Sequence, residues 1–303
     1  MQVFLRMLGT AMVTSMVDNS RETLACLVID DPLLIPRYGC LDYQKLLNSM
    51  KRHNFFTEIA FIPWNYRRSH TKTVRLFADN PDYFSVCVHG CNHTTNEFGE
   101  GNYQELKTLL SIALWRMEQH KLLTGLPYDP VFVFPQGRFS SVAMQTLKDQ
   151  GFLAAFNSTL RATDANEPSE VEYLRPATTM YHDFPLFLRR YPKEKTGFVS
   201  DLIHGRPIII VEHHNVFRDG YNSITDLVDW VNSLGNIKWT SLYHIAERYS
   251  GRNTFNLGQS VIPLPSNPFL NTKIALRRFL SEARDNYVET SSLLTKCYRI
   301  LRG

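Results

Sequence analysis

The amino-acid sequence predicts an α/β fold built on a largely parallel sheet, and three observations support this prediction. Short apolar runs alternate with stretches of helical periodicity along most of the 303 residues, as is typical of repeated βα units. Several runs are nearly continuous in apolar residues, which indicates strands buried on both faces. Most runs end in polar or charged residues, and the carboxyl ends of strands carry the functional groups in such folds.

The strands are predicted from apolar runs that are bounded by polar residues or glycine. The clearest run is the last one, which contains four consecutive apolar residues at 208–211. The first run ends in two aspartates and a proline. In chain order, the predicted strands cover 23–32, 56–65, 83–90, 130–137, 151–158 and 206–214.

Helices are predicted between the strands, where apolar residues recur at helical spacing. Gly125 and Gly151 follow two of these segments, and both are expected C-caps because glycine readily adopts the left-handed conformation that closes a helix. The last of the segments begins with a serine as its expected N-cap and ends at Gly235. The predicted helices cover 41–53, 103–125, 140–151 and 223–235.

The chain divides into three predicted regions. Residues 1–21 form an N-terminal segment, and residues 22–250 form the α/β domain. Residues 251–303 contain a proline-rich loop followed by amphipathic helices with mixed charges. Mixed charges on an amphipathic helix favour a solvated outer face and an inner face that packs on the domain.

The composition excludes several classes of protein. Apolar residues make up 44% of the chain and charged residues 20%, which is ordinary for a globular protein. The net charge of +4 is small, and no basic stripe interleaves with aromatic residues, so no nucleic-acid partner is expected. The apolar run after Arg6 spans about eleven residues, too short to cross a bilayer. No integral membrane segment is therefore expected, and a weak signal peptide is the alternative for this run.

The cysteines indicate reduced thiols. There are five of them, an odd number, and their spacing does not suggest a disulfide framework. Cys26 and Cys87 lie within apolar runs, where cysteine is usually a small buried hydrophobic residue. A cytoplasmic location is the expectation that follows.

Acids and histidines gather at the predicted strand ends. Because the carboxyl ends of parallel strands share one rim, these side chains are expected to converge. They are Asp30 and Asp31 after the first strand, His89 and His93 after the third, and Glu212, His213 and His214 after the last.

These residue types suit a metal-dependent hydrolase. One carboxylate and two imidazoles are a common ligand set for Zn²⁺ that leaves a position open for water. His89 and His93 have the spacing of one helical turn, which can direct both rings at one ion. Such a metal lowers the pKa of its water and polarises a carbonyl group. A second carboxylate can then act as the general base and another histidine as the general acid.

Each motif also has a simpler explanation. An Asp-Asp-Pro sequence is often only a turn, and His213 and His214 can be one buried and one solvated histidine. Cys91 is either a fourth ligand that would close the metal site or a filler of the turn. Trp64 is either a platform for a sugar ring or a packed core residue. The joint occurrence of the motifs at strand ends favours a functional site.

The motifs IDDP, HGCNH, FPQG and IVEHH occur in this order, and together they resemble the polysaccharide deacetylase family, carbohydrate esterase family 4, also called the NodB homology domain. The resemblance covers residues 22–250. It implies a distorted (β/α) barrel of the glycoside hydrolase and deacetylase type, here with a C-terminal helical extension. It also implies a carbohydrate substrate that carries an N-acetyl group, and one bound divalent metal ion, with zinc expected and cobalt or nickel as alternatives.

The resemblance assigns roles to the first two motifs. Asp30 corresponds to the general base of the family, and Asp31 corresponds to its metal-binding aspartate. His89 and His93 correspond to the two metal-binding histidines.

The resemblance also assigns roles to the last two motifs. The backbone N–H of Gln136 corresponds to the group that stabilises the oxyanion. His213 corresponds to the general acid, with His214 as the alternative. The residues expected to contact the substrate are Trp64, Pro135, Gly137 and Arg138.

The sequence departs from the family at several positions. The third motif normally begins with an arginine that orients the base, and Val133 occupies that position. Arg138, or Arg189 and Arg190, are the candidates to supply the charge instead. Gln136 replaces the tyrosine of the turn. The fourth motif is not visible, so residues 159–205 are predicted to form a different substrate loop.

Three hypotheses of function follow. The first is a metal-dependent hydrolase that removes an N-acetyl group from a carbohydrate. The second is a catalytically impaired carbohydrate-binding or regulatory protein on a deacetylase scaffold, which the missing arginine and fourth motif favour. The third is a metal-dependent hydrolase of a different bond. The sequence makes no prediction of the oligomeric state.

Overall fold

The structure is a computed structural model, and it describes residues 22–164, 179–250 and 272–280. The predicted N-terminal segment 1–21 lies outside the described residues. So does the predicted C-terminal region, apart from a helical stretch over 272–280. The structure therefore tests the predictions for the α/β part of the chain.

The strands form one main sheet and one small hairpin. The hairpin pairs β2 (Arg37–Tyr38) with β3 (Leu41–Asp42). The strands of the main sheet are β1 (Thr23–Asp30), β4 (Thr57–Phe61), β5 (Phe84–His89), β6 (Asp129–Val133), β7 (Ala154–Asn157), β8 (Thr179–Tyr181), β9 (Phe184–Leu188), β10 (Ile208–His213) and β11 (Ile237–Trp239).

The main sheet is largely parallel, which confirms the predicted fold class. Its order is β10-β1-β4-β5-β6-β7-β9-β8, with β11 beside β1. Only β8 is antiparallel to its neighbour. A parallel bridge links Arg190, which follows β9, to Ile210 on β10. The bridge brings β9 next to β10, so the sheet curves into a distorted barrel.

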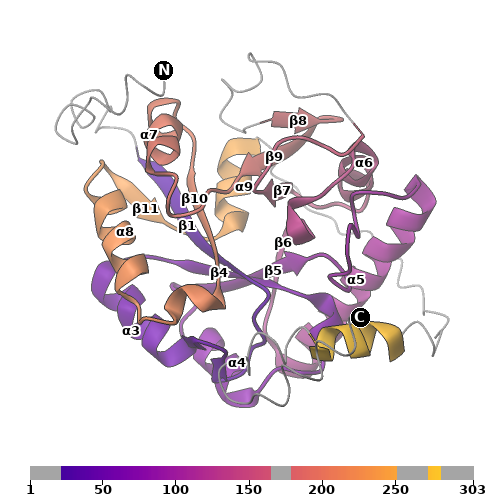
Figure 1. Cartoon of the computed structure of the whole chain (residues 1–303), viewed down its shortest axis with the longest axis horizontal. Helices are drawn as coiled ribbons and strands as arrows, with labels where there is room; N and C mark the ends of the chain where they lie inside the picture. Colours follow the sequence, from indigo (N-terminus) through magenta and orange to yellow (C-terminus); the bar gives the residue numbers. More distant parts are fainter. Residues whose placement is uncertain (1–21, 165–178, 251–271, 281–303) are drawn as a thin grey trace, which may run out of the picture.

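Helices surround the strands (Figure 1). The α-helices are α3 (Tyr43–His53), α4 (Thr71–Ala78), α5 (Tyr103–Thr124), α6 (Ser141–Asp149), α7 (Lys195–Ile203), α8 (Asn222–Asn232) and α9 (Leu242–Ser250). The short 3-10 turns are η1 (Pro63–Asn65), η2 (Pro135–Gly137) and η4 (His214–Phe217).

Alternation along the strands produces two cores. On β1, Ala25, Leu27 and Ile29 belong to the larger core that the surrounding helices share. Cys26 and Val28 point the other way, into a second core together with one face of each neighbouring strand. Helix α9 contributes Leu242, Ile245 and Ala246 to that second core, so its apolar face packs against the strands that line this core.

The helix ends partly match the prediction. Gly125 caps α5 in the left-handed conformation, with φ 75°, as predicted. Gly151 also has φ 84°, although the C-cap of α6 is the preceding residue, Gln150. The predicted serine N-cap is wrong, because Ser223 lies inside α8 and the capping residue is Tyr221. Helix α8 also ends before Gly235, at Asn232.

The prediction of a substrate loop over 159–205 is largely wrong. The described part of this segment holds β8, β9 and α7, and β9 extends the sheet beside β7. The run 184–188 contains one proline among bulky apolar residues. Its place in the sheet depends on pairing with a distant strand, which the local sequence pattern does not reveal.

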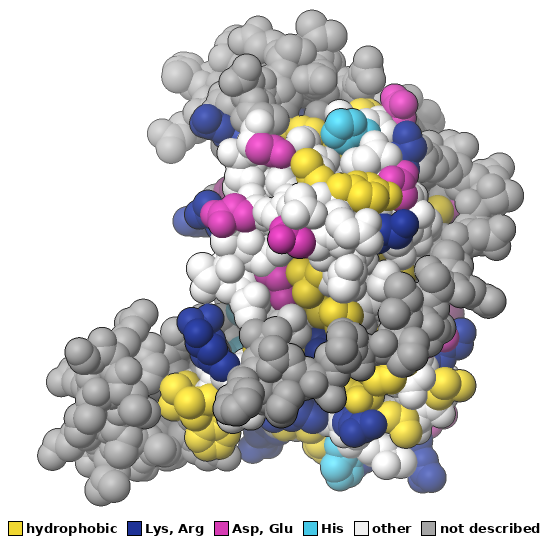
Figure 2. Space-filling model, turned by 90° about the vertical axis from the view of Figure 1, so that its right-hand side faces the viewer, with side chains coloured by type: hydrophobic (Ala, Val, Ile, Leu, Met, Phe, Trp, Pro, Cys, Tyr) yellow, Lys and Arg dark blue, Asp and Glu magenta, His cyan; other side chains and the backbone are white. Residues whose placement is uncertain are grey.

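The surface of the described part carries mixed charges. On the face in Figure 2, basic and acidic side chains are interspersed rather than collected in one basic stripe. No helix within the described ranges has the length and apolar character needed to span a bilayer. Cys26, Cys40, Cys87 and Cys91 are free thiols, as expected.

Candidate active site

The carboxyl ends of the strands bring the predicted metal ligands together. Asp31 follows β1, His89 ends β5, and His93 follows four residues later. Asp31 Oδ1 lies 3.3 Å from His89 Nε2 and 3.0 Å from His93 Nε2. One ligand atom from each of the three residues lies within 4.8 Å of the other two, and within the described ranges this is the cluster that has the form of a metal site.

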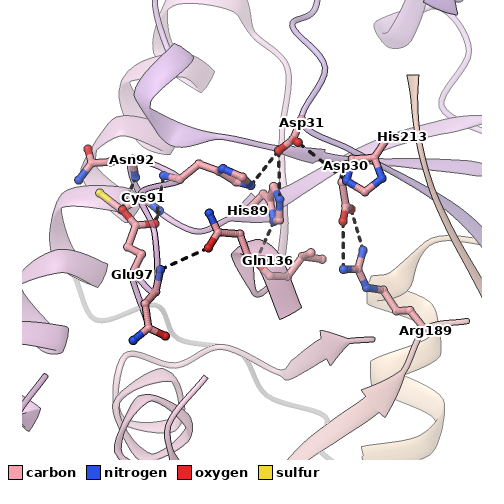
Figure 3. Close-up of polar contacts among 12 residues, drawn as sticks. Asp30, Asp31, His89, Cys91, Asn92, Glu97, Gln136, Arg189 and His213 are labelled. Atoms are coloured by element: carbon pink, nitrogen blue, oxygen red, sulfur yellow. Dashed lines mark hydrogen bonds and ion pairs between the residues drawn. The ribbon is translucent and has the colours of Figure 1, made fainter. Parts of the chain in front are cut away.

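The orientation of His89 prepares it as a ligand. Its side chain is 2% exposed, and its Nδ1 lies 3.0 Å from the carbonyl oxygen of Val133. Because a carbonyl oxygen only accepts, Nδ1 carries a proton, and Nε2 is directed towards Asp31 (Figure 3). This is the usual arrangement around a metal-binding histidine, whose second nitrogen donates to a carbonyl or carboxylate.

The three residues fit a divalent cation. Asp31 Oδ1 is buried and no well-directed hydrogen bond reaches it, although the Nε2 atoms of His89 and His93 lie 3.3 Å and 3.0 Å away. A buried carboxylate oxygen without a hydrogen bond is unfavourable unless a positive charge lies close to it. Oxygen and imidazole nitrogen donors suit zinc and related ions.

Electrostatics around this cluster also favour a cation. Burial raises the pKa of Asp31, but the charges and hydrogen bonds of His93 and His89 together outweigh burial and hold that pKa well below its usual value. Burial lowers the pKa of His93, and the Asp31 carboxylate outweighs it, so the net shift is upwards. The carboxylate therefore stays ionised and attracts positive charge.

The turn that carries His93 is not helical, so the spacing argument from one helical turn is wrong. Asp31 has φ 79° and His93 has φ 57°, in the left-handed region that residues with a Cβ atom rarely adopt. Gln136 on a neighbouring turn has φ 57°. Strained backbone at a cluster of polar residues is a common feature of functional sites.

Asp30 forms a buried ion pair with Arg189. The guanidinium Nη1 and Nη2 donate to Oδ1 at 2.7 Å and Oδ2 at 3.1 Å, and both side chains are nearly inaccessible. Burial raises the pKa of Asp30, and Arg189 reverses the shift, so that the pKa lies below its usual value. Of the candidate arginines, Arg190 instead pairs with Asp201, and Arg138 donates to Asn96.

The two histidines at the end of β10 point to different places. Asp30 and His213 are paired in the register of β1 and β10, and His213 Nε2 lies 3.9 Å from Asp31 Oδ2. The His213 side chain is 41% exposed and faces the site (Figure 3). His214 is buried, with its ring edge-on to Tyr38 at 5.0 Å. Glu212 accepts from the backbone N–H of His213.

The turn Pro135–Gly137 lies beside the three predicted metal ligands. Gln136 is exposed, and its side-chain oxygen accepts from the backbone N–H of Asn96 at 3.3 Å. Gly137 has φ 68°, and a Cβ there would lie 2.8 Å from Ser158 Oγ. The Gly137 carbonyl accepts from Asn157 Nδ2 at 2.9 Å. These contacts hold the backbone of the turn in one conformation.

Trp64 and Cys91 contact each other, and both contact Arg116. The backbone N–H of Trp64 donates to the Cys91 carbonyl at 3.0 Å, and the Arg116 guanidinium lies over the indole ring at 4.8 Å. The Cys91 thiol is fully buried against Arg116, and burial raises its pKa far above the usual value. A protonated thiol is a poor metal ligand, so Cys91 fills the turn.

Two polar residues that support the site have no motif in the sequence. Asn157 is fully buried at the end of β7, and Glu97 accepts backbone N–H groups of the His93 turn. The polar residue at the end of an apolar run was a usable signal for Asn157. Glu97 lies in a polar loop without periodicity, and nothing local distinguishes it from its neighbours.

Comparison with known proteins supports the fold. Neither the models of protein families nor the curated protein sequences match the chain. The crystal structure of a Mycobacterium smegmatis protein assigned to the polysaccharide deacetylases matches with a TM-score of 0.50, at 14% identity, over 80% of this chain and 94% of that chain. The chain therefore has a deacetylase-type fold, as predicted.

Two further structures are similar at lower scores. A family 4 carbohydrate esterase from Streptomyces lividans, in complex with acetate, matches with a TM-score of 0.44, at 12% identity, over 73% of this chain and 93% of that chain. A family 4 pseudoenzyme from Bacillus anthracis matches with a TM-score of 0.38, at 11% identity, over 72% of this chain and 67% of that chain.

Proposed function

We propose that the chain is a divergent polysaccharide deacetylase, a metal-dependent hydrolase that removes an N-acetyl group from a carbohydrate. The observation that carries the proposal is the convergence of Asp31, His89 and His93 beside a second aspartate that an arginine holds ionised. A bound divalent ion, with zinc expected, would polarise the amide carbonyl and acidify a water molecule.

The protein's own groups supply the proton transfers. Asp30 accepts the proton of the attacking water, and Arg189 keeps its carboxylate ionised and oriented through two hydrogen bonds. His213 is exposed on the same rim, and it donates a proton to the leaving amine. The backbone N–H of Gln136 donates to the developing oxyanion. Trp64, Pro135, Gly137 and Arg138 would contact the sugar at this rim.

The ion pair with Arg189 favours catalysis over a purely binding role. The absence of an arginine at Val133 is the main argument for an impaired protein. Arg189 reaches Asp30 from the end of β9, two strands along the sheet from β6, which carries Val133. The charge next to the base is therefore present although the family's position for it is not used.

Metal content and acetate release test the proposal. We expect about one divalent ion per chain in the purified protein, and its loss in the His89→Ala/His93→Ala variant. The metal-loaded protein should release acetate from N-acetylated saccharides. Failure to bind Zn²⁺, Co²⁺ or Ni²⁺ would exclude a metal-dependent hydrolase. Metal binding without acetate release from any saccharide would favour a binding protein or a hydrolase of another bond.

A further inference from the structure

The carboxylate of Glu97 accepts three consecutive backbone N–H groups from the turn that carries His93. Oε2 accepts from Cys91 at 2.9 Å and from His93 at 3.1 Å, and Oε1 accepts from Asn92 at 2.7 Å (Figure 3). Successive N–H groups that converge in a turn form a concave site for an anion. Here the anion is a side chain of the same loop, and hydrogen bonds to an ionised acceptor are among the stronger ones.

The conformation of His93 requires such support. Its φ of 57° is disfavoured for a residue with a Cβ atom, and nothing in the sequence forces it. The hydrogen bond from the His93 N–H to Glu97 holds the backbone in this conformation. The imidazole then lies with Nε2 3.0 Å from Asp31 Oδ1.

Gly90 shows that the turn is built around this carboxylate. Gly90 has φ 64°, and a Cβ at this position would lie 2.6 Å from Glu97 Oε2 and 2.3 Å from Pro135 Cγ. Only glycine therefore fits between the end of β5 and the carboxylate. The spacing between Gly90 and Glu97 is fixed by a contact, although no sequence motif marks it.

The hydrogen-bond acceptors of the same turn are bound by an arginine. Arg116 on α5 is 7% exposed, and its Nη1 donates to the Cys91 carbonyl at 3.2 Å and to Asn92 Oδ1 at 2.7 Å. The N–H groups of the turn thus face a carboxylate and its acceptors face a guanidinium. Groups of the protein itself therefore satisfy both the donors and the acceptors of this turn.

We propose that Glu97 is a positioning residue that holds His93 ready for metal binding. The inference rests on the proposed metal site but concerns affinity for metal rather than turnover. Loss of the carboxylate would free the backbone at 91–93, and ordering this turn would then oppose metal binding. Substitution of a residue that orients a metal ligand commonly weakens metal affinity by about 10- to 100-fold.

Zinc affinity of purified variants tests the inference. We would measure the Kd for Zn²⁺ by calorimetry in the wild type, Glu97→Gln, Glu97→Asp and Glu247→Gln. Glu247 is an exposed residue of α9, so its variant controls for the loss of one negative charge. Glu97→Asp keeps the charge on a shorter arm and serves if the glutamine variant does not fold. Amide hydrogen exchange of 91–93 in the metal-free proteins reports on the turn itself.

The outcomes separate the inference from the proposed function. We expect Glu97→Gln to raise the Kd by about 10-fold or more, Glu97→Asp to raise it by less, and Glu247→Gln to leave it unchanged. Faster exchange at 91–93 should accompany the weaker binding. A wild type that binds zinc, with Glu97 variants within about twofold of it, would overturn the role of Glu97 alone. A wild type that binds no metal would overturn the proposed function together with this inference.

Discussion

Arg189 and Asp30 lie 159 residues apart in the sequence, and they form a bidentate ion pair inside the barrel. The pair joins β9 to the end of β1, two strands that are not neighbours in the sheet. Both residues are at most 5% exposed. The contact therefore couples the proposed general base to a part of the chain that carries no recognisable motif.

Substitution of Arg189 should move the pH dependence of activity. Arg189 lowers the pKa of Asp30, so its loss raises that pKa, and the carboxylate becomes protonated at higher pH. We expect the acidic limb of the kcat/KM profile of Arg189→Lys to shift upwards, because lysine keeps the charge but cannot bind both oxygens. Arg189→Ala should also lose about 3–5 kcal/mol of stability through an unpaired buried charge.

The control for this prediction is metal affinity, because Arg189 contacts Asp30 and not the three predicted ligands. Zinc binding by Arg189→Lys should match the wild type. An unchanged pH profile in a folded, metal-loaded variant would remove Arg189 from the catalytic scheme.

The neighbouring aspartates should separate catalysis from metal binding. Asp30→Asn removes the base and should lower kcat by about 10²- to 10⁴-fold while zinc remains bound. Asp31→Asn removes a predicted ligand and should reduce zinc content and activity together. Elemental analysis beside an acetate-release assay distinguishes the two variants. Loss of zinc in Asp30→Asn alone would reverse the assignment.

His213 and His214 should differ in the same way. His213 faces Asp31 and is partly exposed, so His213→Ala should lower kcat by about 10²-fold or more with little change in stability. His214 is buried against Tyr38, so His214→Ala should lower the melting temperature and leave kcat largely intact. Thermal unfolding and steady-state kinetics of both variants check this. The opposite result would make His214 the general acid.

Glu58 should make the protein less stable as the pH rises above the ordinary carboxyl pKa. It lies on β4 at the opposite end of the barrel, where it is fully buried and accepts from Ser85 Oγ and, at 3.1 Å, from the N–H of Leu242. Burial and the nearby Asp129 carboxylate raise its pKa well above the usual value. The protonated form is thus favoured in the folded state, so its contribution is complete below the ordinary carboxyl pKa. It is lost as pH rises through the raised pKa.

Glu58→Gln should remove this decline, because an amide is neutral at every pH and has nearly the same shape. The free energy of unfolding in urea, measured between about pH 5 and 8, checks the prediction. Ser85→Ala is the matched control, since it removes a hydrogen bond to Glu58 but leaves the carboxyl group. Equal slopes for wild type and Glu58→Gln would show that Glu58 does not set the pH dependence.

Much of the α/β part was predictable because its signals are local. The apolar run at 208–211 and the glycine after Thr124 depend on burial and on backbone preference within a few residues. The strand ends of β1 and β5 were placed by the same signals. Since parallel strands direct their carboxyl ends to one rim, the proximity of Asp31 to His89 followed from strand positions alone.

The errors arose where local pattern and tertiary context disagree. Ser223 is a good capping residue, yet α8 begins one residue earlier and uses no side-chain cap. Residues 184–188 contain a proline and lack regular alternation, yet they form β9 because β7 offers a free edge. Propensity is a weak prior when a neighbouring strand provides the missing partners.

The sequence by itself determined the fold class, the rim on which the polar residues gather and the residues that suit a metal ion. Only the tertiary structure decided that Arg189 pairs with Asp30, that His213 rather than His214 faces the rim, and that Glu97 lies beneath the His93 turn. The physical reason is the separation in sequence of the residues that interact. Helices, strands and their ends follow from interactions over a few residues, whereas an ion pair between distant strands depends on the curvature and register of the whole barrel.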